Sequence, residues 1–482
     1  MRNGFRSLAN IVPAIDISTL RQGSLYMASL GFGKITQLLV IFVYSYFLSP
    51  KDFGFYSVFS SYIWILAVFI SVNAYLAIGR YLYEHDVDND IMLSTVMIFM
   101  LFTSAAYILA LSIFLYYNST EWGPLVWACL LVVSIGFIFE NIITQIAAYL
   151  QNGRYLLVPS AAKAIMSCIT TFVILYTAAR PDGMALVLGD VVGAMVMVLY
   201  FFIFGEFRLH WVLSASYLRK MFAYALPLTP YMLALTLLSQ FDRVIIDALE
   251  GGAAAGLYGL SYNFGILPLM VATALTNALT RRFFEQLRAG DTRALAAQSR
   301  YIFGIAGVCF AGVMAFGEVT AWLLLPDRFA PAFDIIPVVA YGGMVFSLFQ
   351  VWVRVLAFRD KPGQISAIAT VGTVVNIGLN LALIPILGFK VAAWSTVVAY
   401  MGMTLVCMWL VKVRHAIDTI SLRSTLMSLA FGALPLLLVG LFAFSFVAKQ
   451  ALLTVWFGAF AVYVMRPVLM RDGDEARLAE GR

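Results

Sequence analysis

Charged residues are scarce in this sequence, and their scarcity excludes a soluble protein. Only 12% of the 482 residues are Asp, Glu, Lys or Arg, whereas 62% are hydrophobic. A soluble globule of this length needs far more polar side chain to cover its surface. The composition therefore predicts a polytopic membrane protein.

Cysteine and histidine are also rare, with four and three residues respectively. The cysteines fall within apolar runs, which favours small core residues over disulfides or metal ligands. No two histidines have metal-ligand spacing, and the sequence lacks a phosphate-binding lysine loop, a dinucleotide fingerprint and a large polar domain. We therefore predict no metal site, no organic cofactor and no enzymatic activity.

Long apolar runs take up most of the chain. A bilayer core about 30 Å thick needs about 20 apolar residues per helix, and the chain offers about 14 such runs. The runs are apolar on all sides, which excludes the alternating pattern of a barrel. We expect an all-α polytopic fold with about 14 transmembrane helices. They span approximately 24–48, 54–78, 91–116, 123–150, 156–178, 184–205, 219–249, 256–284, 300–325, 333–358, 363–386, 389–411, 424–447 and 450–470.

Most of the 31 Lys and Arg residues fall on the side of the N-terminus when they are sorted on these helices. The positive-inside rule then places both termini in the cytoplasm. This asymmetry explains the net charge of +6 without nucleic-acid binding. We expect 1–22 to be a cytoplasmic amphipathic segment rather than a cleaved signal peptide, and 471–482 to be a cytoplasmic tail.

The chain repeats itself. Gly54-Phe55-Tyr56 recurs as Gly256-Leu257-Tyr258, and the RYLYE stretch at 80–84 recurs as RRFFE at 281–285. Matches in the same order at one offset predict two pseudo-repeated six-helix lobes. The expected lobes are 23–210 and 211–412, with helices 13 and 14 appended in 413–470.

Helix-breaking residues occupy corresponding helices of the two halves. Gly31 and Gly33 lie in the first helix, and Pro227 and Pro230 lie in the seventh. Breaks at equivalent positions point to the binding region of a transporter, because freed backbone groups are tolerated only beside a cavity. These four residues are the candidate hinges, although packing and bending would also explain them.

Some cations fall inside the expected helices. A charge at the bilayer centre costs about 2.5 to 3.5 kcal/mol and should face protein or water. Lys34 lies about 15 Å into its helix, near the midplane. We predict that Lys34, Lys163, Arg354 and Arg80 bind an anionic substrate. The alternatives are an ion pair between Lys34 and an acid such as Glu140, and interfacial anchoring of the other three.

Asp242 and Arg243 form a charged pair near the outer end of the seventh helix, which suggests an outer gate or an ion site. Asn376 and Asn380 are four residues apart and share a face of the eleventh helix, and Thr396 follows in the next. With a nearby acid, their oxygens would ligate a hard cation. Hydrogen bonds that join neighbouring helices are the alternative role.

Three stretches resemble a known family. They are FLSPKDFGFYSVF at 47–59, FDRVIIDALEGGAAAGLYGLSYNF at 241–264 and VGTVVNIGLNLALIPILGFKVAAWSTVVAY at 371–400. They are similar to the polysaccharide biosynthesis flippases of the O-antigen type, which carry lipid-linked oligosaccharides. This family belongs to the multidrug/oligosaccharidyl-lipid/polysaccharide exporter superfamily. The similarity covers essentially residues 20 to 470.

The resemblance implies a two-lobed, V-shaped bundle with alternating access in the bacterial cytoplasmic (inner) membrane. Its substrate would be an isoprenoid diphosphate-linked oligosaccharide, such as an O-antigen, capsule or exopolysaccharide unit, moved from the cytoplasmic to the outer leaflet. Polysaccharide polymerase or export proteins would be partners. The resemblance names no particular sugar.

The lipid II flippase of the same superfamily has a basic cavity and a cation site on helices 7, 11 and 12. Asp242, Asn376, Asn380 and Thr396 occupy comparable helices here. Coupling to Na+ or H+, or drive by the membrane potential alone, stays open. Two other functions stay open as well: a cation-coupled drug or metabolite exporter of the same fold, and a membrane-embedded glycan polymerase or ligase.

Overall fold

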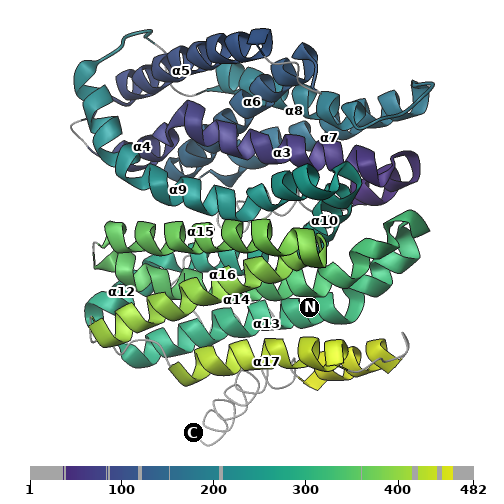
Figure 1. Cartoon of the computed structure of the whole chain (residues 1–482). Coiled ribbons are helices and arrows are strands. Elements are labelled where there is room, and N and C mark those ends of the chain that lie inside the picture. Colours follow the sequence, from purple (N-terminus) through teal and green to yellow (C-terminus); the bar gives the residue numbers. More distant parts are fainter. Residues whose placement is uncertain are drawn as a thin grey trace, which may run out of the picture. The chain divides into compact units, whose positions relative to one another are not determined.

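The computed structural model describes most of the chain. The described residues are 36, 39–82, 84, 87–117, 122–150, 152–205, 210–359, 361–414, 422–441 and 448–459. Every regular element in these ranges is a helix (Figure 1). The all-α prediction is therefore confirmed.

The chain divides into two compact units. The first unit combines the described residues of Ser24–Leu260 with Pro362–Ala392, and the second combines the described residues of Ser261–Lys361 and Ala393–Arg482. The helices of the first unit are α3 (Pro50–Ser71), α4 (Ala74–Tyr81), α5 (Asn89–Tyr117), α6 (Pro124–Tyr149), α7 (Gly153–Thr177), α8 (Met184–Phe204), α9 (Ala215–Glu250), the first part of α10 (Gly252–Gly265) and α15 (Pro362–Leu387).

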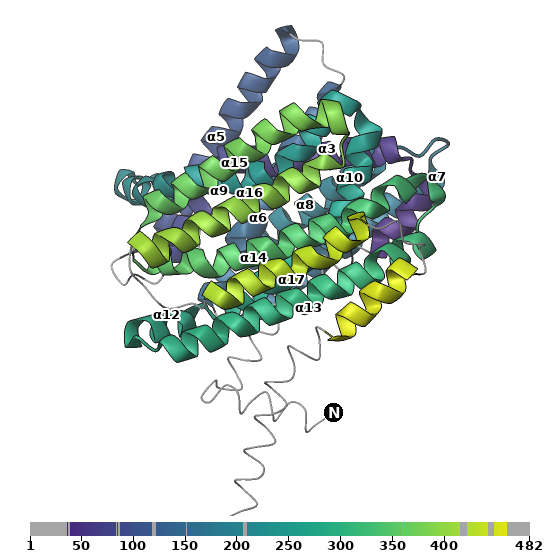
Figure 2. The same ribbon diagram turned by 60° about the horizontal axis from the view of Figure 1, so that its bottom comes forward.

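The second unit holds the end of α10 and the later helices. These are α11 (Leu267–Ala278), α12 (Thr280–Ala289), α13 (Thr292–Leu324), η1 (Asp327–Ile335), α14 (Ile336–Phe358), nearly all of α16 (Val391–Trp409), η2 (Leu410–Arg414) and α17 (Leu422–Leu441). Within this unit α14 packs along α13 and α17 (Figure 2). Trp352 of α14 is fully buried, and its indole N–H donates to Thr425 Oγ1 at 3.2 Å.

Ten helices in the described ranges are long and apolar enough to cross a membrane, or eleven if the bent pair α10–α11 counts as one span. The expected spans 24–48, 424–447 and 450–470 lie partly outside the described residues. The multi-pass prediction is confirmed, and the count of about 14 stays a prediction. The lobe boundaries at 23–210, 211–412 and 413–470 also stay predictions.

The expected second helix is broken. Ser49 and Asp52 form a capping box that starts α3 at Pro50. α3 ends at Val72 and Asn73, which have positive φ angles of 46° and 55°. Non-glycine residues rarely adopt this left-handed conformation. At Val72 and Asn73 it ends the helix, and the chain turns before α4 begins.

α9 continues as one helix of 36 residues through both Pro227 and Pro230. The expected break at these prolines is therefore absent, and it is the neighbouring helix that is broken. The hydroxyl of Thr229, between the prolines, lies 3.0 Å from Ala225 O on its own helix and 3.2 Å from Val72 O at the α3 break. Asn73 Nδ2 lies 3.4 Å from the same hydroxyl. Thr229 thus meets backbone groups that the turn leaves free.

Close glycine contacts hold α8 against α7. A Cβ added to Gly189 would lie 2.0 Å from Thr171 Oγ1, and one added to Gly193 would lie 3.1 Å from Lys163 Cγ. Two glycines four residues apart present a flat strip on one helix face, which lets the backbones approach. This strip also makes room for the Lys163 side chain.

Candidate functional site

Asp242 is the centre of a buried polar cluster between α9 and α15. Its side chain is 1% exposed, and both carboxylate oxygens accept hydrogen bonds. The Tyr258 hydroxyl donates to Oδ2 at 2.8 Å, and Asn380 Nδ2 donates to Oδ1 at 2.8 Å. Asn376 Oδ1 lies 3.4 Å from the same Asn380 nitrogen. Asp242 and the two asparagines that the sequence singled out therefore meet in one place.

The two helices hold this cluster by running side by side (Figure 1). Thr373 and Asn380 are seven residues apart on α15, so they lie on one face about two turns apart. Thr373 Oγ1 donates to Ala234 O at 2.8 Å, two turns before Asp242 on α9. Both polar contacts thus follow one seam between parallel helices.

The cluster offers oxygen atoms to a hard cation. Asn380 is fully buried, and its Oδ1 has no hydrogen-bond partner among the described residues. Asp242 and Asn376 face the Asn380 nitrogen rather than this oxygen, and the three side chains together carry one formal negative charge. Carboxylate and carbonyl oxygens are the donors that hard cations take. One carboxylate balances the charge of a monovalent ion, and the described residues hold no group of three or more His, Cys, Asp or Glu that would hold a metal ion.

Thr396 and Arg243, which were predicted together with these residues, lie in different units of the structure. Thr396 is a buried residue of α16 in the second unit, so its predicted place in the cation cluster is not tested. Arg243 is 7% exposed, and its guanidinium donates to Gln240 Oε1 at 2.6 Å and to Ser239 O at 3.2 Å. These contacts on its own helix hold Arg243 inside the first unit, and its gating role stays a prediction.

Tyr258 is a site residue that the sequence indicated only as part of the repeated Gly256-Leu257-Tyr258 motif. The repeat carried the signal, because Tyr56 at the equivalent position also donates to a carboxylate, Asp190 Oδ2, at 2.8 Å. Each Gly-x-Tyr motif therefore places a tyrosine hydroxyl on an aspartate.

The glycines of the two motifs lie against each other. A Cβ on Gly54 would lie 1.7 Å from Gly252 O, and one on Gly256 would lie 1.9 Å from Pro50 O. Such distances leave no room for any side chain, so glycine is required at both positions. The start of α3 and the start of α10 therefore meet backbone to backbone.

Lys163 belongs to a second polar cluster, between α6, α7 and α8. Its Nζ lies 2.5 Å from Glu140 Oε2, and the two side chains are 31% and 28% exposed. Asp190 is close enough to interact electrostatically with Lys163, and it accepts from Ser167 Oγ at 3.5 Å. Two carboxylates thus accompany one ammonium group. Glu140, which was named as an alternative partner for Lys34, pairs with Lys163 in the structure.

Arg354 and Arg80 also have partners. Arg354, in the second unit, donates from Nη1 to Thr276 O and from Nη2 to Asn277 Oδ1 at 3.2 Å. It therefore caps the C-terminal end of α11, where cations are favourable. Arg80 is more than half exposed, lies 3.8 Å from Glu84 Oε1, and stacks over the Tyr224 ring at 5.0 Å. Lys34, Gly31 and Gly33 lie outside the described residues.

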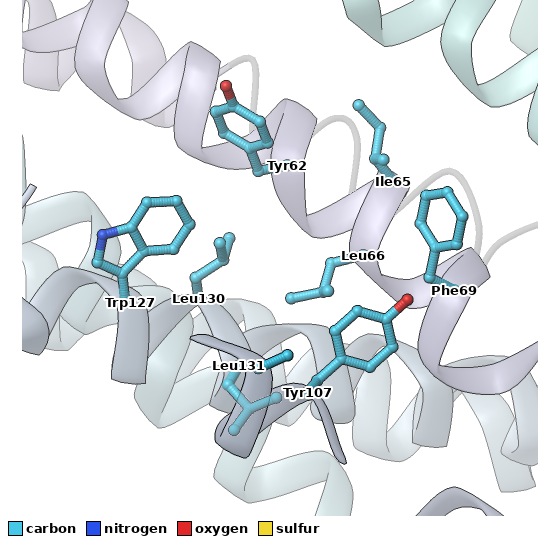
Figure 3. Close-up of a pocket in the computed structure, with 9 residues that line it drawn as sticks. Tyr62, Ile65, Leu66, Phe69, Tyr107, Trp127, Leu130 and Leu131 are labelled. Carbon is cyan, nitrogen blue, oxygen red and sulfur yellow. The ribbon is translucent and has the colours of Figure 1, made fainter. Parts of the chain in front are cut away.

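A groove of about 290 Å³ opens between α3, α5 and α6 of the first unit. The side chains around it are aliphatic and aromatic, among them Tyr62, Leu66, Tyr107 and Leu130 (Figure 3). None of the residues that line it is charged. Because a diphosphate needs cations or a row of N–H donors, this groove is not a site for a charged head group.

Comparison with known proteins identifies the family. The model of the polysaccharide biosynthesis protein family matches residues 19–285, which is more than half of the 482 residues. The chain belongs to this family. The resemblance that three sequence motifs indicated is thus confirmed. No curated protein matches the chain.

Solved structures of other transporters share the fold of this polysaccharide biosynthesis protein. The lipid II flippase MurJ in an inward closed conformation is 14% identical with a TM-score of 0.68, covering 92% of this chain and 99% of MurJ. An inward-facing multidrug resistance MATE transporter of the MOP superfamily is 13% identical with a TM-score of 0.60, covering 83% and 98%. A MOP superfamily transporter from Pyrococcus furiosus, described as having a binding pocket of reverse polarity, is 15% identical with a TM-score of 0.56, covering 83% and 95%. The protein therefore has the fold of membrane flippases and exporters.

Proposed function

We propose that this protein is a flippase that moves an isoprenoid diphosphate-linked oligosaccharide from the cytoplasmic to the outer leaflet by alternating access. Membership of the polysaccharide biosynthesis family carries the proposal, and the likeness to a lipid II flippase over 92% of the chain supports it. The diphosphate would be neutralised by Lys34, Lys163, Arg354 and Arg80, while the isoprenoid tail stays in lipid. The bacterial inner membrane, with both termini in the cytoplasm, is the proposed location.

The test is the identity of the lipid that accumulates when the gene is deleted. We expect a lipid-linked oligosaccharide on the cytoplasmic leaflet and loss of surface polysaccharide. The purified protein should move that same lipid across reconstituted vesicles. Deletion without any accumulated glycolipid, together with normal surface polysaccharide, would refute the proposal.

We further propose that the cluster of Asp242, Asn376 and Asn380 binds a monovalent cation that drives the cycle. The unpartnered Asn380 Oδ1 beside the buried Asp242 carboxylate supports this role. Drive by the potential alone is the alternative, because moving an anion out of a negative interior gains about 2.3 kcal/mol per charge per 100 mV.

Replacing the Asp242 carboxylate distinguishes ion-coupled transport from transport driven by the membrane potential alone. Asp242→Asn should abolish Na+- or H+-dependent flipping in vesicles, since the amide removes the only charge among Asp242, Asn376 and Asn380. Asn is nearly the same size as Asp, so the variant leaves no cavity at this buried position, and its folding can be checked by thermal unfolding. Flipping that runs at the wild-type rate on potential alone, with no ion gradient, would argue against ion coupling.

Export of an organic cation is a second candidate function, and one observation favours it. Glu140 and Asp190 outnumber Lys163 in the α6–α8 cluster, so this cluster is net acidic. Such a cluster suits a cationic drug better than a diphosphate. Resistance of the host to cationic drugs, measured with and without the gene, distinguishes the two functions.

A further inference from the structure

α12 is a short helix between two long ones in the second unit. Leu279 interrupts the helix after α11 with ψ near 2°, and α12 then runs from Thr280 to Ala289. Gly290 ends it in the left-handed conformation, with φ of 67°, and Asp291 accepts the Ala294 N–H at 2.9 Å to start α13. α12 and α13 therefore form a tight hairpin at one end of apolar spans.

The hairpin has one apolar face. Phe283 is 1% exposed, and the ring of Phe284 lies 5.8 Å from that of Phe358 on α14. The remaining side chains of α12 are mainly polar, and Glu285 and Arg288 are exposed. The apolar side of α12 therefore packs on the protein, and its polar side is left facing outward.

Arginine dominates the polar face. Residues 281 to 300 contain five arginines and no lysine. Arg288, Arg293 and Arg300 are exposed, and Arg282 is half-buried. Arg293 and Arg300 are seven residues apart on α13, so they share a face about two turns apart. Among the described residues, no ion pair engages these four guanidinium groups.

Few acids oppose these cations. Asp291 is occupied by the cap of α13, which leaves Glu285 as the other acid between 281 and 300. A guanidinium fork bonds two oxygens of one phosphate or carboxylate group at once, so arginine is well suited to bind either anion. Basic side chains at the end of membrane spans are the usual contacts of anionic lipids.

We propose that Arg282, Arg288, Arg293 and Arg300 of the α12–α13 hairpin bind the phosphate groups of anionic bilayer phospholipids. This surface is independent of the proposed flippase substrate. The binding of the second unit to the membrane would then depend on the fraction of anionic lipid in the leaflet that this surface faces. The occupant is a phosphatidylglycerol-type head group, identified by charge complementarity.

The test uses the full chain with bound lipid counted by native mass spectrometry. The protein is reconstituted in vesicles of phosphatidylcholine in which about one lipid in five is phosphatidylglycerol, the anionic probe. We expect the purified protein to retain phosphatidylglycerol selectively, with retention falling as salt rises. The variant Arg282→Gln/Arg288→Gln/Arg293→Gln/Arg300→Gln should retain about tenfold less.

Two matched variants make the result specific. Lys51→Gln/Arg180→Gln/Arg328→Gln/Lys390→Gln removes the same charge from exposed positions elsewhere and should retain phosphatidylglycerol normally. Changing the four hairpin arginines to lysine should give intermediate retention, because charge remains without the fork. Equal loss in both glutamine variants, or no loss in the hairpin variant with unchanged thermal unfolding, would overturn the proposal. Displacement of the bound lipid by an equimolar isoprenoid diphosphate would reassign the surface to substrate capture and would also overturn it.

Discussion

Two tyrosine hydroxyls each donate a hydrogen bond to an aspartate in this protein. Tyr258 donates to Asp242, and Tyr56 donates to Asp190, each at 2.8 Å. The Asp242 carboxylate is almost wholly buried, so each lost donor leaves a charge less well solvated. These hydroxyls therefore hold charge inside the first unit.

Removing one hydroxyl tests this role. Tyr258→Phe keeps the ring but removes the donor to Asp242, and we expect a loss of about 1 to 3 kcal/mol in the free energy of unfolding. The half-buried Tyr56→Phe is the matched variant and should lose less. Thermal unfolding in detergent measures both. Equal melting temperatures for wild type and Tyr258→Phe would contradict the assigned hydrogen bond.

Lys163 and Glu140 give a second prediction at the scale of single residues. If their ion pair holds α6 to α7, Lys163→Met and Glu140→Gln should each destabilise the protein, and the double variant should recover part of the loss. We expect a coupling energy on the order of 1 to 3 kcal/mol, because residues in contact are not additive. Additive losses would instead fit the predicted cavity role of Lys163, without a structural pair.

The helices depend on glycine where they touch. The corner formed by α3 and α10 has no room for a Cβ at Gly54 or Gly256, and this corner repeats a motif that the two halves share. On the predicted topology the corner lies on the outer side. An alternating-access cycle that opens this side would have to separate these backbones.

A methyl group at this corner tests the contact. Gly256→Ala should cost about 1 to 3 kcal/mol, since the methyl carbon would meet Pro50 O and force the helices apart. Gly378→Ala on α15 is the control, because nothing lies within 4 Å of its Cβ position. There we expect a gain of up to about 1 kcal/mol from helix propensity. Similar unfolding curves for the two variants would mean that the corner relaxes freely.

At the scale of the whole molecule, a flippase with a central cation should lose transport without losing its fold. Lys34→Ala is expected to abolish surface polysaccharide at unchanged protein level, because we propose that the Lys34 ammonium group binds the diphosphate. Immunoblotting of membranes together with staining of surface glycan measures both quantities. Arg180→Ala, a change at an exposed cation in the turn between α7 and α8, should leave export intact. Normal export by Lys34→Ala would remove this residue from the site.

The sequence by itself determined the membrane class, the helical fold, the family and the shared face of Asn376 and Asn380. These follow from local chemistry, because apolar runs in lipid must satisfy their own backbone and residues four apart on a helix share a side. The tertiary structure decided the partners of the charges. Lys163 meets Glu140, Arg354 meets the end of α11, and Asp242 meets Tyr258 as well as Asn380.

The tertiary structure also decided where a helix breaks. Pro227 and Pro230 are local signals for a break, yet α9 runs through them, and the chain turns at Val72 and Asn73 instead. The Thr229 hydroxyl approaches the backbone of α9 and the carbonyl of Val72, which helps to hold both conformations. The contact between Thr229 and Val72 joins residues 157 positions apart, and periodicity along one helix holds no information about it.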